Sequence, residues 1–129
     1  MKILSPTLNL DETANEKLIE KTINSLKDTV GAFCILARDE LNYVQTLSTD
    51  HGFILEFQNG GMDHHYQISS LLSRPQTIAL LKAYFNNNED WCAKFEIEKK
   101  NIRSFLGRLG YNIGSFIGNL IRGFKEVRN

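Results

Sequence analysis

The chain is poor in cysteine, which limits two kinds of chemistry. Its two cysteines, Cys34 and Cys92, lie in apolar segments that are predicted to be strands, where a free thiol packs as a small hydrophobic side chain. Neither has an apparent base to activate it, so neither is predicted to be a nucleophile. A disulfide between them would need neighbouring strands and an oxidising compartment, and we expect both thiols to be free.

Catalytic and phosphate-binding motifs are also lacking. The sequence holds no glycine-rich phosphate loop, no serine nucleophile elbow and no Cys-x-x-Cys pair. His64 and His65 are adjacent, and successive residues of a strand point to opposite faces, so the two imidazoles are not placed to share a metal ion. His51 falls in a predicted loop. We therefore expect no catalytic residue, no metal site and no cofactor, and we predict that the protein is not an enzyme.

The first residues form too short an apolar run for a signal peptide, and the sequence shows no linker, repeat or low-complexity segment. With 129 residues, the chain is long enough to bury one hydrophobic core without disulfides or metal ions. These features predict a single domain over residues 1–129 and a cytoplasmic location.

Charge is unevenly distributed along the chain, although the formal net charge is zero. Residues 1–98 hold 8 Lys and Arg against 14 Asp and Glu, a net charge of −6. Residues 99–129 hold 7 against 1, a net charge of +6. The two parts either neutralise each other on folding or present an acidic and a basic surface to different partners.

Four short β-branched or aromatic runs predict antiparallel strands joined as hairpins, at residues 31–37, 41–47, 52–57 and 62–68. The first run is apolar on both parities, which indicates a strand buried on both faces. Residues 58–61 (Gln-Asn-Gly-Gly) are the strongest turn signal. We expect the turn to close on Gly60 and Gly61, which sets Glu56 opposite His65 and avoids the repulsion of Glu56 by Asp63.

Helices are predicted on both sides of these strands. A capping box formed by Thr13 and Glu16 predicts a helix that ends near residue 28. A second capping box, at residues 73–76, predicts a helix that ends at residues 86–88. Alternating apolar and polar residues over 91–98 predict a fifth strand. The inward-facing residues are expected to be Leu18, Ile19, Thr22, Ile23 and Leu26 in the first helix, and Ile78, Leu81 and Phe85 in the second.

An apolar stripe at helical spacing predicts a long, basic, amphipathic C-terminal helix over about residues 100–127. Glycines along its border permit close backbone approach to a sheet, another helix or a bilayer. The helix either closes the core, or acts at a membrane surface or in self-association. We expect no nucleic-acid binding, because the strands place no basic residues beside their aromatic ones. These helix-packing or membrane-contacting glycines are Gly107, Gly110, Gly114 and Gly118.

The predicted fold is therefore α+β. It combines a mainly antiparallel five-stranded sheet with an N-terminal helix, one helix before the last strand and the long C-terminal helix.

An acidic surface is the main candidate for binding a partner. Carboxylates at alternate strand positions are predicted to lie on solvated faces, where Glu56 also pairs with His65. Trp91 follows two acidic residues, and it is either a core tryptophan at the sheet edge or an aromatic anchor for a basic partner. The candidate partner-binding residues are Glu56, Asp63, His65, Glu89, Asp90, Trp91, Glu96 and Glu98.

The order of these segments resembles the small immunity proteins of bacterial polymorphic and contact-dependent toxin systems. The resemblance covers residues 31–98 and lies in pattern alone. It implies a small cytosolic α+β domain that binds a cognate toxin, often through an acidic surface, and blocks its active site. No binding residue carries over, because such surfaces diverge with their toxins. The residues that carry the resemblance are Phe33-Cys-Ile-Leu36, Tyr43-Val-Gln45, Gly52-Phe-Ile-Leu-Glu-Phe57, Asn59-Gly-Gly61, His65-Tyr66, Trp91 and Phe95-Glu96.

The leading hypothesis is therefore stoichiometric inhibition of a toxin protein, whose association is steered by the carboxylates. The alternative is a membrane-surface or self-associating module that acts through residues 100–127.

Overall fold

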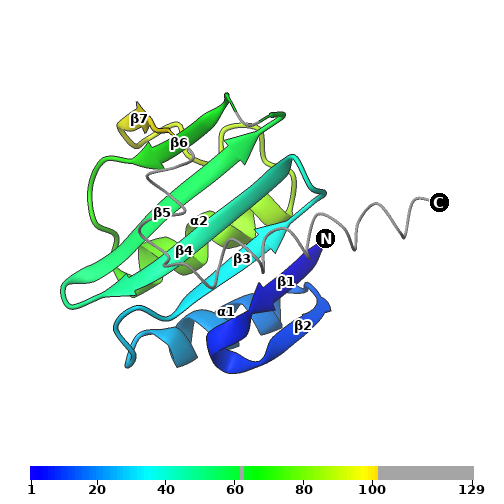
Figure 1. Cartoon of the computed structure of the whole chain (residues 1–129), viewed down its shortest axis with the longest axis vertical. Helices are drawn as coiled ribbons and strands as arrows, with labels where there is room; N and C mark the ends of the chain where they lie inside the picture. The colour runs from blue at the N-terminus through cyan, green and yellow to red at the C-terminus, as the bar shows by residue number, and fades with distance from the viewer. Residues whose placement is uncertain (62, 102–129) are drawn as a thin grey trace.

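The computed structural model of the chain describes residues 1–61 and 63–101 (Figure 1). In this part, seven antiparallel strands form one sheet in the order β2-β1-β3-β4-β5-β6-β7. The two helices lie together behind this sheet in Figure 1, so they cover the same face. The elements in chain order are β1 (Lys2–Ser5), the 3-10 turn η1 (Pro6–Leu8), β2 (Leu10–Thr13), α1 (Glu16–Leu26), β3 (Phe33–Ala37), β4 (Asn42–Thr49), β5 (Gly52–Asn59), β6 (His65–Ile68), α2 (Arg74–Phe85) and β7 (Ile97–Lys99).

The prediction of an antiparallel α+β fold is confirmed, but the prediction of five strands is wrong, because β1 and β2 form a hairpin before the first helix. Asn9 turns this hairpin with a left-handed φ of 54°. Thr13, predicted to cap the helix, is the last residue of β2. The cap of α1 is Asn15, whose side chain accepts a hydrogen bond of 2.8 Å from the Leu18 amide. Two strands of four residues each are too short for their alternation to stand out.

The predicted strand over residues 91–98 is also wrong, because β7 covers only Ile97–Lys99. The preceding residues form successive turns, in which the amides of Trp91, Ala93 and Phe95 each donate to the carbonyl three residues earlier, at 3.1–3.2 Å. Trp91 and Phe95 still pack against the core from these turns. Ala93 and Ile97 of the same alternation are exposed, and Cys92 is half-buried against the core, so the alternation predicted neither the strand nor the burial of the whole segment.

The four-stranded meander β3–β6 confirms the central prediction, including the burial of β3 on both faces. The predicted register of the last hairpin is wrong by two residues. Glu56 pairs with Gln67 and not with His65, which pairs with Gln58. The turn is longer than expected, because the Asn59 amide donates to the His64 carbonyl at 3.0 Å. A shift of two residues keeps each side chain on its predicted face.

Helix α2 begins as the sequence predicts. Its N-cap, Ser73, accepts a bond of 3.2 Å from the Gln76 amide, and the Gln76 side chain accepts one of 2.9 Å from the Ser73 amide. The buried residues of α2 are Thr77, Leu80, Leu81 and Tyr84, whereas Ile78 and Phe85 are only half-buried. In α1, Leu18 is half-buried, and the fully inward residues are Ile19, Thr22, Ile23 and Leu26, as predicted.

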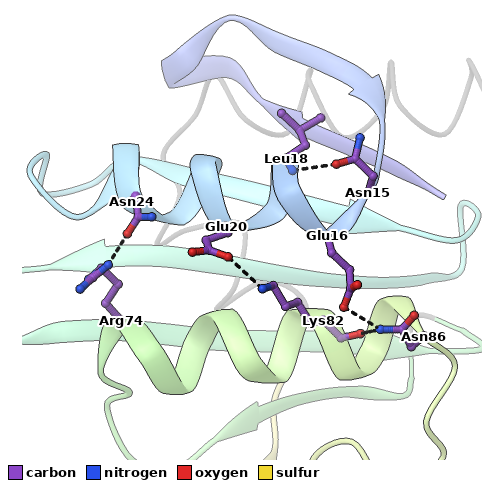
Figure 2. A network of polar contacts seen from close by, with 8 residues as sticks. All are labelled: Asn15, Glu16, Leu18, Glu20, Asn24, Arg74, Lys82 and Asn86. Carbon is purple, nitrogen blue, oxygen red and sulfur yellow. Dashed lines mark hydrogen bonds and ion pairs between the residues drawn. The ribbon is translucent and has the colours of Figure 1, made fainter.

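Polar contacts run along the outer side of the helix pair (Figure 2). Lys82 donates to Glu20 at 2.9 Å, and Asn86 donates to Glu16 at 3.1 Å. Arg74 bonds Asn24 at the other end of the pair. The ion pair lowers the pKa of Glu20 and raises that of Lys82, chiefly through their hydrogen bond. Such exposed contacts fix the alignment of the helices more than they add to stability.

The two faces of the sheet differ in composition. Alternation along each strand places Ile3, Leu36, Val44 and Phe57 in one row under the helices, in the hydrophobic core. We call the opposite side the second face. Its residues include Leu4, Phe33, Ile35, Tyr43, Gln45, Leu47, Ile54, Glu56, Gln58, His65 and Gln67.

The predicted C-terminal helix over about residues 100–127, with Gly107, Gly110, Gly114 and Gly118, lies almost wholly outside the described residues, so the structure gives the long helix no support. Within the described ranges, no helix has both the length and the apolar character needed to cross a membrane.

The approach of Leu72 to β5 predicts a steric penalty at Gly52. This glycine has a φ of +146°, and a Cβ atom built on it would lie 2.7 Å from the Leu72 carbonyl oxygen, beside the backbone bonds that join Phe53 to Leu72. Gly60 also has a positive φ, +90°, but a Cβ there meets nothing within 4 Å. Gly60→Ala should lower the free energy of unfolding by about 1–2 kcal/mol. Gly52→Ala should cost about 1–3 kcal/mol more. Urea titration of both variants measures the difference, and equal losses would contradict the close approach.

Candidate protein-binding cleft

A cleft of about 220 Å³ lies where the end of α2 meets β3, β4 and β5. Its apolar wall comes from Phe57, Tyr84 and Trp91, and its polar rim includes Arg38 and Glu89. The amides of Asn42, Gln58, Asn59, Asn87 and Asn88 complete the lining.

Trp91 is the central side chain of the cleft. Its ring meets Phe57 edge-on with centroids 5.0 Å apart, and Tyr84 edge-on at 5.2 Å. The turn that follows α2 holds its backbone, since the Trp91 amide donates to the Asn88 carbonyl at 3.2 Å. Trp91 is half-buried, so it packs on the core with one part and lines the cleft with another. Its packing on the core agrees with the first of its two predicted roles, and its role as an anchor for a basic partner stays a prediction.

Arg38 ties the end of β3 to the last turn of α2. Its guanidinium carbon lies 4.3 Å from the centre of the Tyr84 ring, and its Nη2 donates to the Tyr84 carbonyl at 2.9 Å. A cation suits this position because the carbonyls at a helix C-terminus carry partial negative charge. Burial raises the pKa of the Tyr84 hydroxyl to about 12, so the ring stays neutral under the cation.

The rest of the wall is held by hydrogen bonds. Asp39 Oδ1 accepts from the Asn42 amide at 2.9 Å and from its side chain at 3.0 Å. The Tyr43 hydroxyl donates to Gln58 Oε1 at 3.0 Å. Asn42 and Gln58 are therefore fixed before any ligand arrives, which lowers the entropic cost of binding.

Two of the predicted partner-binding residues lie inside the protein. Glu56 is 4% exposed and His65 is 0% exposed, so the prediction that they lie on a solvated face is wrong. The predicted pair itself is present, with 3.3 Å between His65 Nε2 and Glu56 Oε2. Polar residues at alternate strand positions show that a face is polar, but not whether it is covered.

The other predicted carboxylates are exposed but do not form one patch. Glu89 lines the cleft, and Asp90 is its neighbour in the chain. Glu96 and Glu98 lie at β7, the sheet edge, where Glu98 pairs with Lys100 at 3.0 Å. This contact lowers the pKa of Glu98. Asp63 is exposed in the turn between β5 and β6.

The sequence prediction missed Arg38, Tyr84 and the amide residues of the rim. Arg38 stands in a turn and Tyr84 in a helix, and only the fold brings them together. The sequence predicts that the run Asn86-Asn-Asn88 ends the helix, but not that it lines a cleft. Among the described side chains, no three of His, Cys, Asp and Glu are grouped so that they could hold a metal ion.

Comparisons with known protein families, characterised proteins and solved structures gave no match to this chain. The geometry and the chemistry of the cleft are therefore the features of this chain that indicate a function.

Burial predicts unequal reactivity of the two thiols. It raises the pKa of Cys34 to about 12 and also raises that of Cys92, which is half-buried. At pH 8 a thiol reagent should modify Cys92 slowly and leave Cys34 unmodified, whereas both should react in urea. Since the pKa of Cys34 exceeds its ordinary value of 9.0, its contribution to stability is complete below pH 9 and is lost as the pH rises toward 12. In a Cys92→Ser variant, Cys34 is the remaining thiol, and its rapid reaction in the native state would contradict its burial.

Proposed function

We propose that the protein is an immunity protein: it binds a toxin protein that has a basic surface, and inhibits it by occlusion without chemistry of its own. The observation that carries this proposal is the half-buried Trp91, held edge-on by Phe57 and Tyr84, at a cleft that also contains Glu89. The family resemblance of residues 31–98 supports a toxin as the partner and the cytoplasm as the site of the encounter.

The residue types of the cleft favour a protein ligand. Trp, Tyr and Arg are the side chains most enriched among residues that dominate binding energy at protein interfaces. Trp91, Tyr84 and Arg38 stand together here, and their mutual contacts fix their positions. The cleft is smaller than the roughly 300–1,000 Å³ typical of sites for small molecules and cofactors. It suits one or two side chains that project from a larger surface.

Charge favours a basic partner. Glu89 and Asp90 are both exposed beside Trp91, so a cationic side chain of the partner can reach them directly. Opposite charge on the partner raises the association rate and limits the choice of partners.

Co-expression tests the proposed function directly. Where the gene immediately upstream of this chain encodes a large secreted protein, the probe is the C-terminal domain of that protein. We expect a one-to-one complex in size-exclusion chromatography with light scattering, and rescue of the growth of cells that produce the domain. Absence of both complex and rescue would contradict the proposal.

Charge reversal tests the surface. Glu89→Lys combined with Asp90→Lys should slow association by about tenfold at low salt, and by much less at 0.5 M salt, because screening removes the steering. Asp11→Lys combined with Glu12→Lys is the matched control, since both are exposed acids on the edge strand β2 and the change in charge is the same. Stopped-flow fluorescence of the single tryptophan reports the rates. An equal effect of both reversals would exclude this surface.

Truncation of the anchor tests its energetic role. Trp91→Ala should weaken binding by at least about 2 kcal/mol, or roughly 30-fold in Kd. Phe95→Ala is the control, because Phe95 is half-buried against the same core but does not line the cleft. Titration calorimetry measures both affinities. A loss from Phe95→Ala as large as that from Trp91→Ala would assign the effect to the fold and not to the cleft.

A further inference from the structure

We infer that the second face of the sheet is the docking surface for residues 102–129 of the same chain. This inference is independent of the cleft and of the proposed toxin partner.

The burial of the second face is the primary observation. Ile35, Gln45 and Glu56 are directly paired neighbours across three central strands, and they are 0%, 3% and 4% exposed. Both described helices lie on the opposite side of the sheet (Figure 1). Side chains in the middle of an uncovered sheet face would be largely open to water. A cover that lies outside the two described ranges therefore removes these residues from water.

The chemistry of the second face selects an amphipathic cover. One region is apolar, with Phe33, Leu47 and Ile54 in a row. The adjoining region is polar and contains the buried pair Glu56–His65 with Gln58. A purely apolar cover would leave these polar groups without water, and a purely polar one would not bury the apolar row.

Residues 102–129 match this requirement in composition and charge. They include Phe105, Leu109 and Phe116 among many apolar residues, and they hold 5 Lys and Arg against 1 Glu. Their net charge of +4 is equal and opposite to the −4 of residues 1–101. Five glycines in the segment allow its backbone to approach a sheet closely.

The attachment point places the segment beside the second face. The Lys100 amide donates to the His65 carbonyl at 2.8 Å, so the described chain ends next to a residue of that face. From there, 28 residues follow. Even at the rise of an α-helix, about 1.5 Å per residue, these residues would span about 42 Å. The seven strands extend across about 29 Å, at about 4.8 Å per strand spacing. The segment is therefore long enough to cross the whole face.

Thiol protection in the full chain tests this assignment. Gln45→Cys places a thiol in the middle of the second face, and Leu71→Cys places one at an exposed site as the control. Both are made with Cys92→Ser, so that the remaining native thiol is the unreactive Cys34. We expect the thiol at position 45 to react with a maleimide at least tenfold more slowly than the thiol at position 71. Equal rates in a chain with native circular dichroism would overturn the inference.

Cleavage identifies the cover. A protease site inserted between Asn101 and Ile102 allows the segment to be cut from the folded full-length protein. We expect the cut segment to co-elute with residues 1–101. If it separates instead, the thiol at position 45 should react with the maleimide as fast as the thiol at position 71. Separation without any change in rate would overturn the inference. A cover supplied by a second copy of the chain would be lost on dilution. Faster reaction of the thiol at position 45 when the uncut protein is diluted would therefore also overturn the inference.

Discussion

The burial of β3 on both faces is the constraint on which the architecture depends. All five of its residues are buried, so the strand must lie inside a sheet and water must be excluded from both sides of it. The hairpin β1–β2 extends the sheet on one side of β3, and the meander through β6 extends it on the other. Helices α1 and α2 exclude water from one face. On the second face, the central residues Ile35, Gln45 and Glu56 are buried as well.

The position of the cleft follows from the way in which α2 is anchored at its two ends. At its start, the backbone bridge between Leu72 and Phe53 fixes the helix against β5, close to Gly52. At its end, Arg38 holds the last turn against the end of β3. The chain must then leave the helix over the sheet, and Trp91 fills the space that this exit creates. The position of the Trp91 side chain therefore depends on the contacts that hold the two ends of α2.

Local signals in the sequence were enough to predict the meander, the second helix and the burial of β3. Each of these depends on neighbouring residues, such as the capping box of Ser73 and Gln76 or the two apolar parities of residues 33–37. The strands β1 and β2 could not be predicted in the same way, because four residues carry little periodicity and Thr13 imitates a helix cap.

Properties that depend on distant parts of the chain were not predictable from local pattern. Glu56 stands at a polar strand position, but its burial is decided by what covers the sheet. Trp91 and its two acidic neighbours were recognised as a candidate contact, whereas Arg38 and Tyr84 belong to the same cleft only because β3 and α2 meet in space. A sequence pattern therefore identified Trp91 as a candidate contact, and the topology supplied the cleft around it.

The order of the strands leaves β2 and β7 at the two margins of the sheet, and both carry charge. Asp11 and Glu12 stand on one margin, and Glu98 and Lys99 on the other. Unpaired backbone groups at such margins invite other chains to add strands, and charged side chains on short strands oppose this. Among the described strands, both margins of the sheet are therefore protected by charge against edge-to-edge pairing with another chain.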